Sequence, residues 1–352
     1  MTENSTEQIQ KKVRDSNMEL LRIVSMFLVL VYHANFLSIG APEIPVCGDL
    51  GNHLTTFARL FLEAGCACCV NVFVLLSGWF GIKPKVNRLC EFLFQVFFFV
   101  AVSIVLLCIF TGHKLCFDDI KNLPMLNASL WFPKAYLLLY ILSPVLNSFV
   151  EKADLKTFQL VLIGFFLFQT AYGWACGGVV WVQGGYSTIS FIGLYLLARY
   201  FKLYTPSIIR KSTSANMFAA YILVILISAI IWYTACAIGI NVDRWMDSYV
   251  SPLVIAESMF LILAFSKLTI QNKAINWIAS SCFAVYLLHC APGVLSHYAN
   301  IINAWNMEQP LHIFLAYTSC LVQSVYSIAI IMDKFRILLW NKTIMKVLKK
   351  YN

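Results

Sequence analysis

Charged side chains are scarce in this sequence. Asp, Glu, Lys and Arg make up 12% of the 352 residues, and only 17 side chains are acidic. Repeats and low-complexity tracts are lacking as well. In their place the sequence has 60% hydrophobic residues and a mean hydropathy of +0.75. This composition excludes a soluble globular protein and predicts an all-α integral membrane protein that crosses the bilayer many times.

About ten apolar runs are long enough to be membrane-spanning helices, so we expect a bundle of about ten transmembrane helices. A polar N-terminal tail (residues 1–17), a membrane domain (18–332) and a basic C-terminal tail (333–352) complete the predicted organisation. The ten runs are 18–37, 57–80, 90–111, 131–150, 157–176, 186–201, 215–240, 250–268, 275–296 and 311–332.

The loops differ strongly in charge. With this assignment, twenty Lys and Arg side chains lie on the side of the N-terminus and four on the other. Because basic loops stay in the cytoplasm, both termini are expected there. The formal net charge of +9 is therefore explained by the basic loops that orient a membrane protein. This distribution argues against a nucleic-acid partner.

Cysteine spacing offers no sign of a metal site or of a disulfide framework. The sequence has 12 cysteines scattered through apolar runs, with Cys66, Cys68 and Cys69 the closest together. Neither a His pair nor a second Cys pair lies at the spacing of a zinc site. We therefore expect these three cysteines to be small packing residues and predict no bound metal.

The first apolar run carries two ionisable side chains, Arg22 near its start and His33 near its end. Eleven residues of α-helix turn through about 1100°, so both side chains share one face, about 16 Å apart along the axis. Each has an ordinary explanation, since an Arg can reach the headgroups and a His can be a packing residue. Because ionisable groups are costly in hydrocarbon, we expect this face to line a polar interior.

Further polar residues are expected in the outer halves of their spans, and two of them, Glu63 and His289, are expected to face one interior cavity with Arg22 and His33. The Trp and Lys among them also suit an aromatic belt and a side chain that reaches the headgroups. These residues are Glu63, Trp131, Lys134, Glu257 and His289.

The order of motifs resembles that of the acyltransferase-3 family of bacterial membrane acyltransferases, over nearly the whole chain. The first helix has Arg and His separated by ten residues (Arg22, His33), and the second ends in VNVFVLLSGWFGI. The basic Arg-x-x-Arg motif of the family is Lys85-Val86-Asn87-Arg88 here, so the bidentate geometry of the first arginine is lost. The segments LWFPKAYLLLYILSPVLN and FAVYLLHCAP match the fourth span and the late Tyr-Leu-x-His segment.

The resemblance implies transfer of an acyl group, usually acetyl from acetyl-CoA, to a cell-surface or lipid-linked saccharide at the inner membrane of a bacterium. His33 suits the general base, with Glu63 as its orienting partner and His289 as a further catalytic candidate. Lys83, Lys85 and Arg88 suit the phosphates of acetyl-CoA, and Arg22 the path of its pantetheine arm. Trp131, Lys134 and Asn71 are the candidates for binding the acceptor.

Other functions fit the same residues. A transporter or flippase for a lipid-linked sugar would also line its pathway with buried charges. An acyltransferase with a succinyl donor or a lipid acceptor is equally compatible with the sequence. Direct transfer and an acyl-histidine intermediate remain open alternatives as well.

Overall fold

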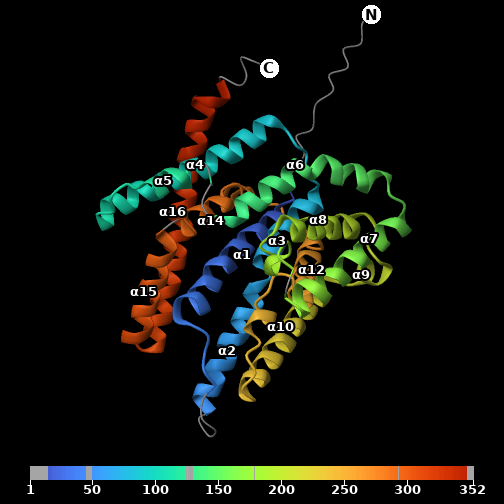
Figure 1. Cartoon of the computed structure of the whole chain (residues 1–352), viewed down its shortest axis with the longest axis horizontal. Coiled ribbons are helices and arrows are strands. Elements are labelled where there is room, and N and C mark those ends of the chain that lie inside the picture. Colours follow the sequence, from blue (N-terminus) through green and yellow to red (C-terminus); the bar gives the residue numbers. More distant parts are fainter. Residues whose placement is uncertain are drawn as a thin grey trace, which may run out of the picture.

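A computed structural model describes residues 15–44, 50–123, 125, 130–177, 179–291 and 293–346. Within these residues the chain is helical and contains no β-strand (Figure 1). Most of the predicted N-terminal tail and the last six residues of the predicted C-terminal tail lie outside the described residues. The elements are α1 (Ser16–Tyr32), η1 (His33–Leu37), α2 (Leu50–Ala67), α3 (Cys69–Phe80), α4 (Val86–Thr111), α5 (Phe117–Asn122), α6 (Trp131–Lys152), α7 (Leu155–Phe168), η2 (Gln169–Ala175), η3 (Gln183–Gly185), α8 (Thr188–Leu203), α9 (Ser207–Lys211), α10 (Ser214–Ala237), α11 (Asp243–Met246), α12 (Pro252–Ser266), α13 (Lys273–Ala279), α14 (Cys282–His289), α15 (Val294–Glu308) and α16 (Leu311–Lys342).

Seven of the described helices are long and apolar enough to cross a membrane, so the predicted count of ten spans is not confirmed. Two of the predicted spans form helices that are too short by this measure. Helices α8 and α12 have 16 and 15 residues. At 1.5 Å per residue they extend about 24 and 22 Å, less than the roughly 30 Å of a hydrocarbon core.

The ninth predicted span is broken. Helices α13 and α14 run up to His289, and α15 then leaves at an angle of 81°. If this bent pair is one span, the count becomes eight. Half-helices of this kind place backbone ends and polar side chains inside a membrane protein. His289 is the last residue of α14 and therefore lies at the break.

Local sequence explains where several helices begin. The side chains of Asp154, Ser187, Thr213 and Asn272 each accept a hydrogen bond from a backbone N–H in the first turn of α7, α8, α10 and α13. Such caps satisfy N–H groups that have no partner within the helix. The N–H of Thr157 lowers the pKa of the Asp154 carboxyl.

Helix α3 is at the centre of the bundle and contacts α1, α8 and α12. Cys66 and Cys68 in the α2–α3 region and Cys69 are buried, as expected for packing residues. The approach of α3 to α8 depends on Gly78. A Cβ there would lie 2.5 Å from the carbonyl oxygen of Tyr195. The two helices therefore pack with their backbones in close contact at this point.

Candidate active site

Helix α1 changes its hydrogen-bonding pattern at His33. The α-helix ends at Tyr32, and residues 33–37 form the π-helical turn η1. Ser38 stabilises this turn by donating a hydrogen bond from Oγ to the carbonyl oxygen of His33 at 2.6 Å. Single π-helical turns inside α-helices are frequent at functional sites. The π-helical turn is therefore a second reason, besides its ionisable side chain, to regard His33 as a candidate site residue.

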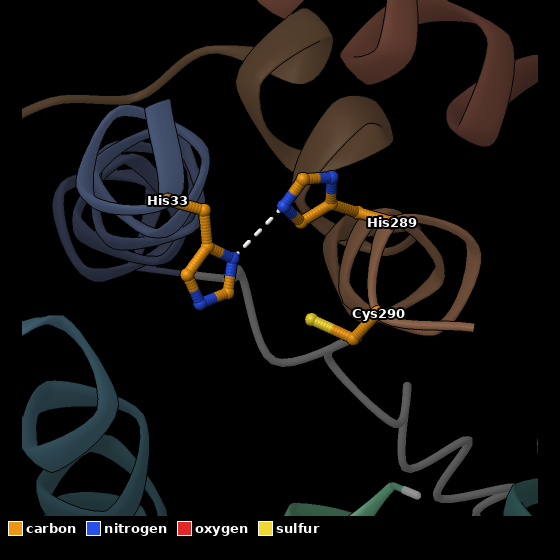
Figure 2. A group of neighbouring side chains, drawn as sticks. All are labelled: His33, His289 and Cys290. Carbon is orange, nitrogen blue, oxygen red and sulfur yellow. Dashed lines mark hydrogen bonds between the residues drawn. The ribbon is translucent and has the colours of Figure 1, made fainter. Parts of the chain in front are cut away.

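The partner of His33 is His289. Nδ1 of His33 and Nε2 of His289 are 2.9 Å apart, and the two rings are stacked with centroids 5.0 Å apart (Figure 2). His289 is fully buried, with Tyr298 edge-on against its ring at 4.4 Å, whereas His33 is half-buried. Residues 256 positions apart in the sequence thus form a histidine pair. One of the two facing nitrogens carries the shared proton.

A cavity of about 520 Å³ lies beside His33. Its size is within the range of small-molecule binding sites. Trp131, a predicted acceptor-binding residue, lines it. The other lining residues are mostly apolar or aromatic: Val29, Tyr32, Leu37, Cys69, Val70, Leu130, Tyr186, Tyr249, Tyr286, Cys290, Ala291, Gly293, Leu295, Ser296 and Ala299.

Three aromatic rings form one wall of this cavity. Trp131 lies 4.4 Å from Tyr186 and is stacked on Tyr249 at 6.0 Å, measured between centroids. Asn71, predicted to bind the acceptor, supports this wall instead, because its Nδ2 donates to the carbonyl oxygen of Tyr249 at 2.8 Å. Lys134 is half-buried on the same helix as Trp131. The wall is aromatic, with one indole and two phenol groups.

The carboxylate of Asp247 is hydrogen-bonded to Tyr32, one of the residues that line the cavity. The hydroxyl of Tyr32 donates to Oδ1 of Asp247, which follows the short helix α11. Burial raises the pKa of the Asp247 carboxyl to about 6. No sequence motif singled out Tyr32, Asp247, Tyr186 or Tyr249 as site residues. Only the position of Tyr32 directly before His33 gave any signal.

Glu63 has a different neighbourhood from the one expected. Nδ2 of Asn35 donates to its Oε2 at 2.8 Å and to the carbonyl oxygen of Arg59 at 3.0 Å. Nε of Arg59 donates in return to Oδ1 of Asn35 at 3.0 Å. Glu63 thus holds η1 two residues beyond His33. The hydrogen bond that orients the His33 ring comes from His289, and not from Glu63.

Arg22 lines a second, smaller cavity of about 240 Å³, together with Ser77, Tyr136 and Ser280. The expectation that Arg22 and His33 face one cavity was therefore wrong. Arg22 forms an ion pair with Glu19, one turn earlier on α1.

Aromatic rings separate the two cavities. Phe132 lines the smaller cavity and Tyr286 the larger, and their ring centroids are 5.5 Å apart. Phe283 lies against both rings, stacked on Tyr286 with centroids 6.0 Å apart. These two cavities therefore lie beside opposite ends of α1, with Phe132, Phe283 and Tyr286 between them.

The basic residues predicted to bind phosphate are exposed. Lys83, Lys85 and Arg88 lie on the connection between α3 and α4 and on the first turn of α4. The hydroxyl of Tyr140 anchors this connection by accepting from the N–H of Lys85 at 2.7 Å and donating to its carbonyl oxygen at 3.0 Å. The connection is thus anchored at Lys85, and all three cationic side chains are exposed to solvent.

Two groups among the described residues have the side chains to hold a metal ion. In the first, ligand atoms of His33, His289 and Cys290 all lie within 4.8 Å of one another. The second is formed by His113, Cys116 and Asp119. There, Oδ2 of Asp119 accepts from the N–H of Cys116 at 2.9 Å and contacts Nε2 of His113 at 2.8 Å, and the backbone bond lowers the pKa of Asp119. Sequence spacing indicated neither group.

Comparison with family models identifies the family of this chain. The family model described as an acyltransferase domain, that of the acyltransferase-3 family, matches residues 15–330. No curated protein and no solved structure matches the chain.

Proposed function

Because the chain belongs to the acyltransferase-3 family of membrane acyltransferases, we propose that it transfers an acetyl group from acetyl-CoA to a hydroxyl of a saccharide. The observation that carries this proposal is the histidine pair beside a cavity of about 520 Å³. The acceptor is a cell-surface or lipid-linked saccharide, and the protein acts in the inner membrane of a bacterium, with both termini in the cytoplasm. The loop charges support this orientation.

In the proposed reaction His33 is the general base. Its Nδ1 faces His289, which leaves Nε2 for the acceptor hydroxyl (Figure 2). As the hydroxyl oxygen attacks the thioester carbonyl, its proton passes to Nε2. The resulting imidazolium donates from Nδ1 to Nε2 of His289. The thioester C–S bond then breaks, and the leaving thiolate of coenzyme A takes the proton from Nε2 of His33 to become the thiol, which returns His33 to its neutral form. His289 is thus a positioning residue that also stabilises the charged form of His33.

The donor side of the proposal rests on the exposed cations and the smaller cavity. Lys83, Lys85 and Arg88 supply positive charge for the phosphates of acetyl-CoA on the cytoplasmic side. Arg22 and the smaller cavity then receive the pantetheine arm. For the thioester to reach His33, the aromatic side chains between the two cavities must move apart.

The acceptor side of the proposal rests on the aromatic wall. Sugars present apolar C–H faces that pack on aromatic rings, and hydroxyl groups that need a few well-placed polar partners. Trp131, Tyr186 and Tyr249 offer the rings, and Tyr32, which lines the same cavity, donates a hydrogen bond to the carboxylate of Asp247. An aliphatic lipid acceptor would have no use for this carboxylate.

The test uses the purified protein in lipid vesicles with acetyl-labelled acetyl-CoA and a panel of oligosaccharides and lipid-linked saccharides. We expect label in a saccharide ester with wild type, and its loss in His33→Ala. Succinyl-CoA in parallel reactions tests the donor. Movement of a lipid-linked sugar across the vesicle without formation of an ester would contradict the proposal and establish the transporter alternative.

A further inference from the structure

Cys290 is a nucleophilic and metal-binding side chain that the proposed reaction does not use. It follows His289 at the break between α14 and α15 and lines the larger cavity. Figure 2 shows its thiol directed into the gap beside the two imidazole rings. The side chains of His33, His289 and Cys290 thus converge from two separate parts of the chain.

We propose that His33, His289 and Cys290 form a binding site for a zinc-class divalent cation, and that this cation inhibits the transferase. The three ligand atoms lie within 4.8 Å of one another, and the two nitrogens are 2.9 Å apart. A tetrahedral zinc ion with bonds of about 2.0 Å to nitrogen and 2.3 Å to sulfur separates its ligand atoms by about 3.3 to 3.6 Å. Small movements of the side chains therefore produce the required geometry.

The ligands select the class of metal. Two imidazoles and a thiolate suit zinc and its soft or borderline neighbours, whereas calcium and magnesium require oxygen ligands. Three protein ligands leave the fourth position of a tetrahedral ion open, and the larger cavity provides space for a water molecule there. Binding converts the thiol of Cys290 to a thiolate and releases its proton to solvent, so charge and atoms balance.

Inhibition follows from the chemistry of the His33 ring, and this step rests on the proposed function. A metal bound to Nδ1 of a neutral imidazole leaves the ring proton on Nε2. Nε2 can then no longer accept a proton from a hydroxyl group. The ion also takes the place of the hydrogen bond between His33 and His289. The metal-bound form therefore lacks both the base and its partner.

The group formed by His113, Cys116 and Asp119 is the weaker candidate. Its carboxylate and thiol already accept backbone hydrogen bonds that cap α5, so a metal would compete with the start of that helix. In the group of His33, His289 and Cys290, the interaction described for Nδ1 of His33 and Nε2 of His289 is the hydrogen bond between the two rings. A metal would replace this bond alone among the interactions described for these two nitrogens.

The test is direct binding of Co²⁺ and Zn²⁺ to the purified full-length protein in detergent. With Co²⁺ we expect one site and an absorption band for charge transfer from sulfur to metal. Cys290→Ser should abolish the band and weaken Zn²⁺ binding at least tenfold. Cys69→Ser, in the same cavity, and Cys116→Ser, in the other group, are the matched controls and should retain both properties.

Transfer activity is the second measurement, with each variant compared with its own rate in the presence of a chelator. Zn²⁺ should inhibit wild type reversibly, and Cys290→Ser should need at least tenfold more Zn²⁺. A Co²⁺ spectrum without sulfur coordination, or loss of binding in Cys116→Ser, would overturn the proposed site. Because binding is measured without substrate, an inactive wild type would refute the proposed function and leave the metal result standing.

Discussion

The histidine pair allows the proposed reaction to be tested by a double-mutant cycle. His33→Ala removes the base, and general-base catalysis contributes about 10²–10⁴-fold, so kcat should fall by that factor. His289→Ala removes only the hydrogen bond to the charged form of His33. Such a bond contributes about 1.5–3 kcal/mol, which corresponds to a fall in kcat of about 10- to 150-fold. Neither change should raise the KM for acetyl-CoA much, since the proposed phosphate contacts lie elsewhere.

The double variant is the decisive member of the cycle. If His289 acts only through His33, its removal should not lower kcat any further once His33 is absent. His33→Ala/His289→Ala should then be about as slow as His33→Ala. His289→Gln is the matched control, because its side-chain oxygen can accept from Nδ1 of His33 and it fills more of the buried space. We expect its rate to lie between wild type and His289→Ala.

The assay is transfer of labelled acetyl from acetyl-CoA to the acceptor at saturating donor, together with thermal unfolding of each variant in detergent. If His289→Ala lowers kcat by the same factor in wild type and in the His33→Ala variant, His289 does not act through His33, and this part of the proposal is refuted. Normal turnover of His33→Ala would refute the choice of base. His289 or Glu63 would then be the next candidate, although Glu63 accepts a hydrogen bond from Asn35.

Three further predictions follow from other parts of the structure. Gly78→Ala should destabilise the protein by about 1–3 kcal/mol, because the added Cβ forces α3 away from α8. The control Gly164→Ala, which has open space at its Cβ, should be neutral or stabilise the protein by up to about 1 kcal/mol. Thermal unfolding compares the two variants, and equal effects would contradict the packing argument. Lys85→Ala and Arg88→Ala should raise the KM for acetyl-CoA more than they lower kcat, and an unchanged KM in steady-state kinetics would remove both from the donor site. The raised pKa of Asp247, about 6, keeps its carboxyl protonated below that pH, so kcat/KM for the acceptor should rise between about pH 5 and 7. This rise in the pH profile should vanish in Asp247→Asn. If the rise persists in that variant, it belongs to the titration of another group.

Much of the secondary structure was predictable because it depends on local properties. A run of apolar residues must satisfy its backbone hydrogen bonds within the segment, so hydropathy alone indicated a helix at each of the ten runs. His33 and His289 could be chosen as candidate site residues from the sequence, since an ionisable side chain in such a run is costly without a purpose. Length was less predictable, because the cores of α8 and α12 are as apolar as a true span.

The pairings within the site depended on tertiary structure. Glu63 was the expected partner of His33, but its carboxylate accepts from Asn35, which Arg59 holds in turn, and His289 lies beside His33. The break after α14 makes this possible, since it brings the end of a half-helix to the π-helical turn.

By itself the sequence determined a helical membrane protein, the apolar segments that build it and the two histidines of its candidate site. Only the tertiary structure decided that these histidines touch, that Cys290 joins them, and that Arg22 lies in a separate cavity. The physical reason is the range of the interactions. Hydropathy and helix periodicity act over a few turns. The packing of helices from opposite ends of the chain sets the distances between side chains that are 256 residues apart.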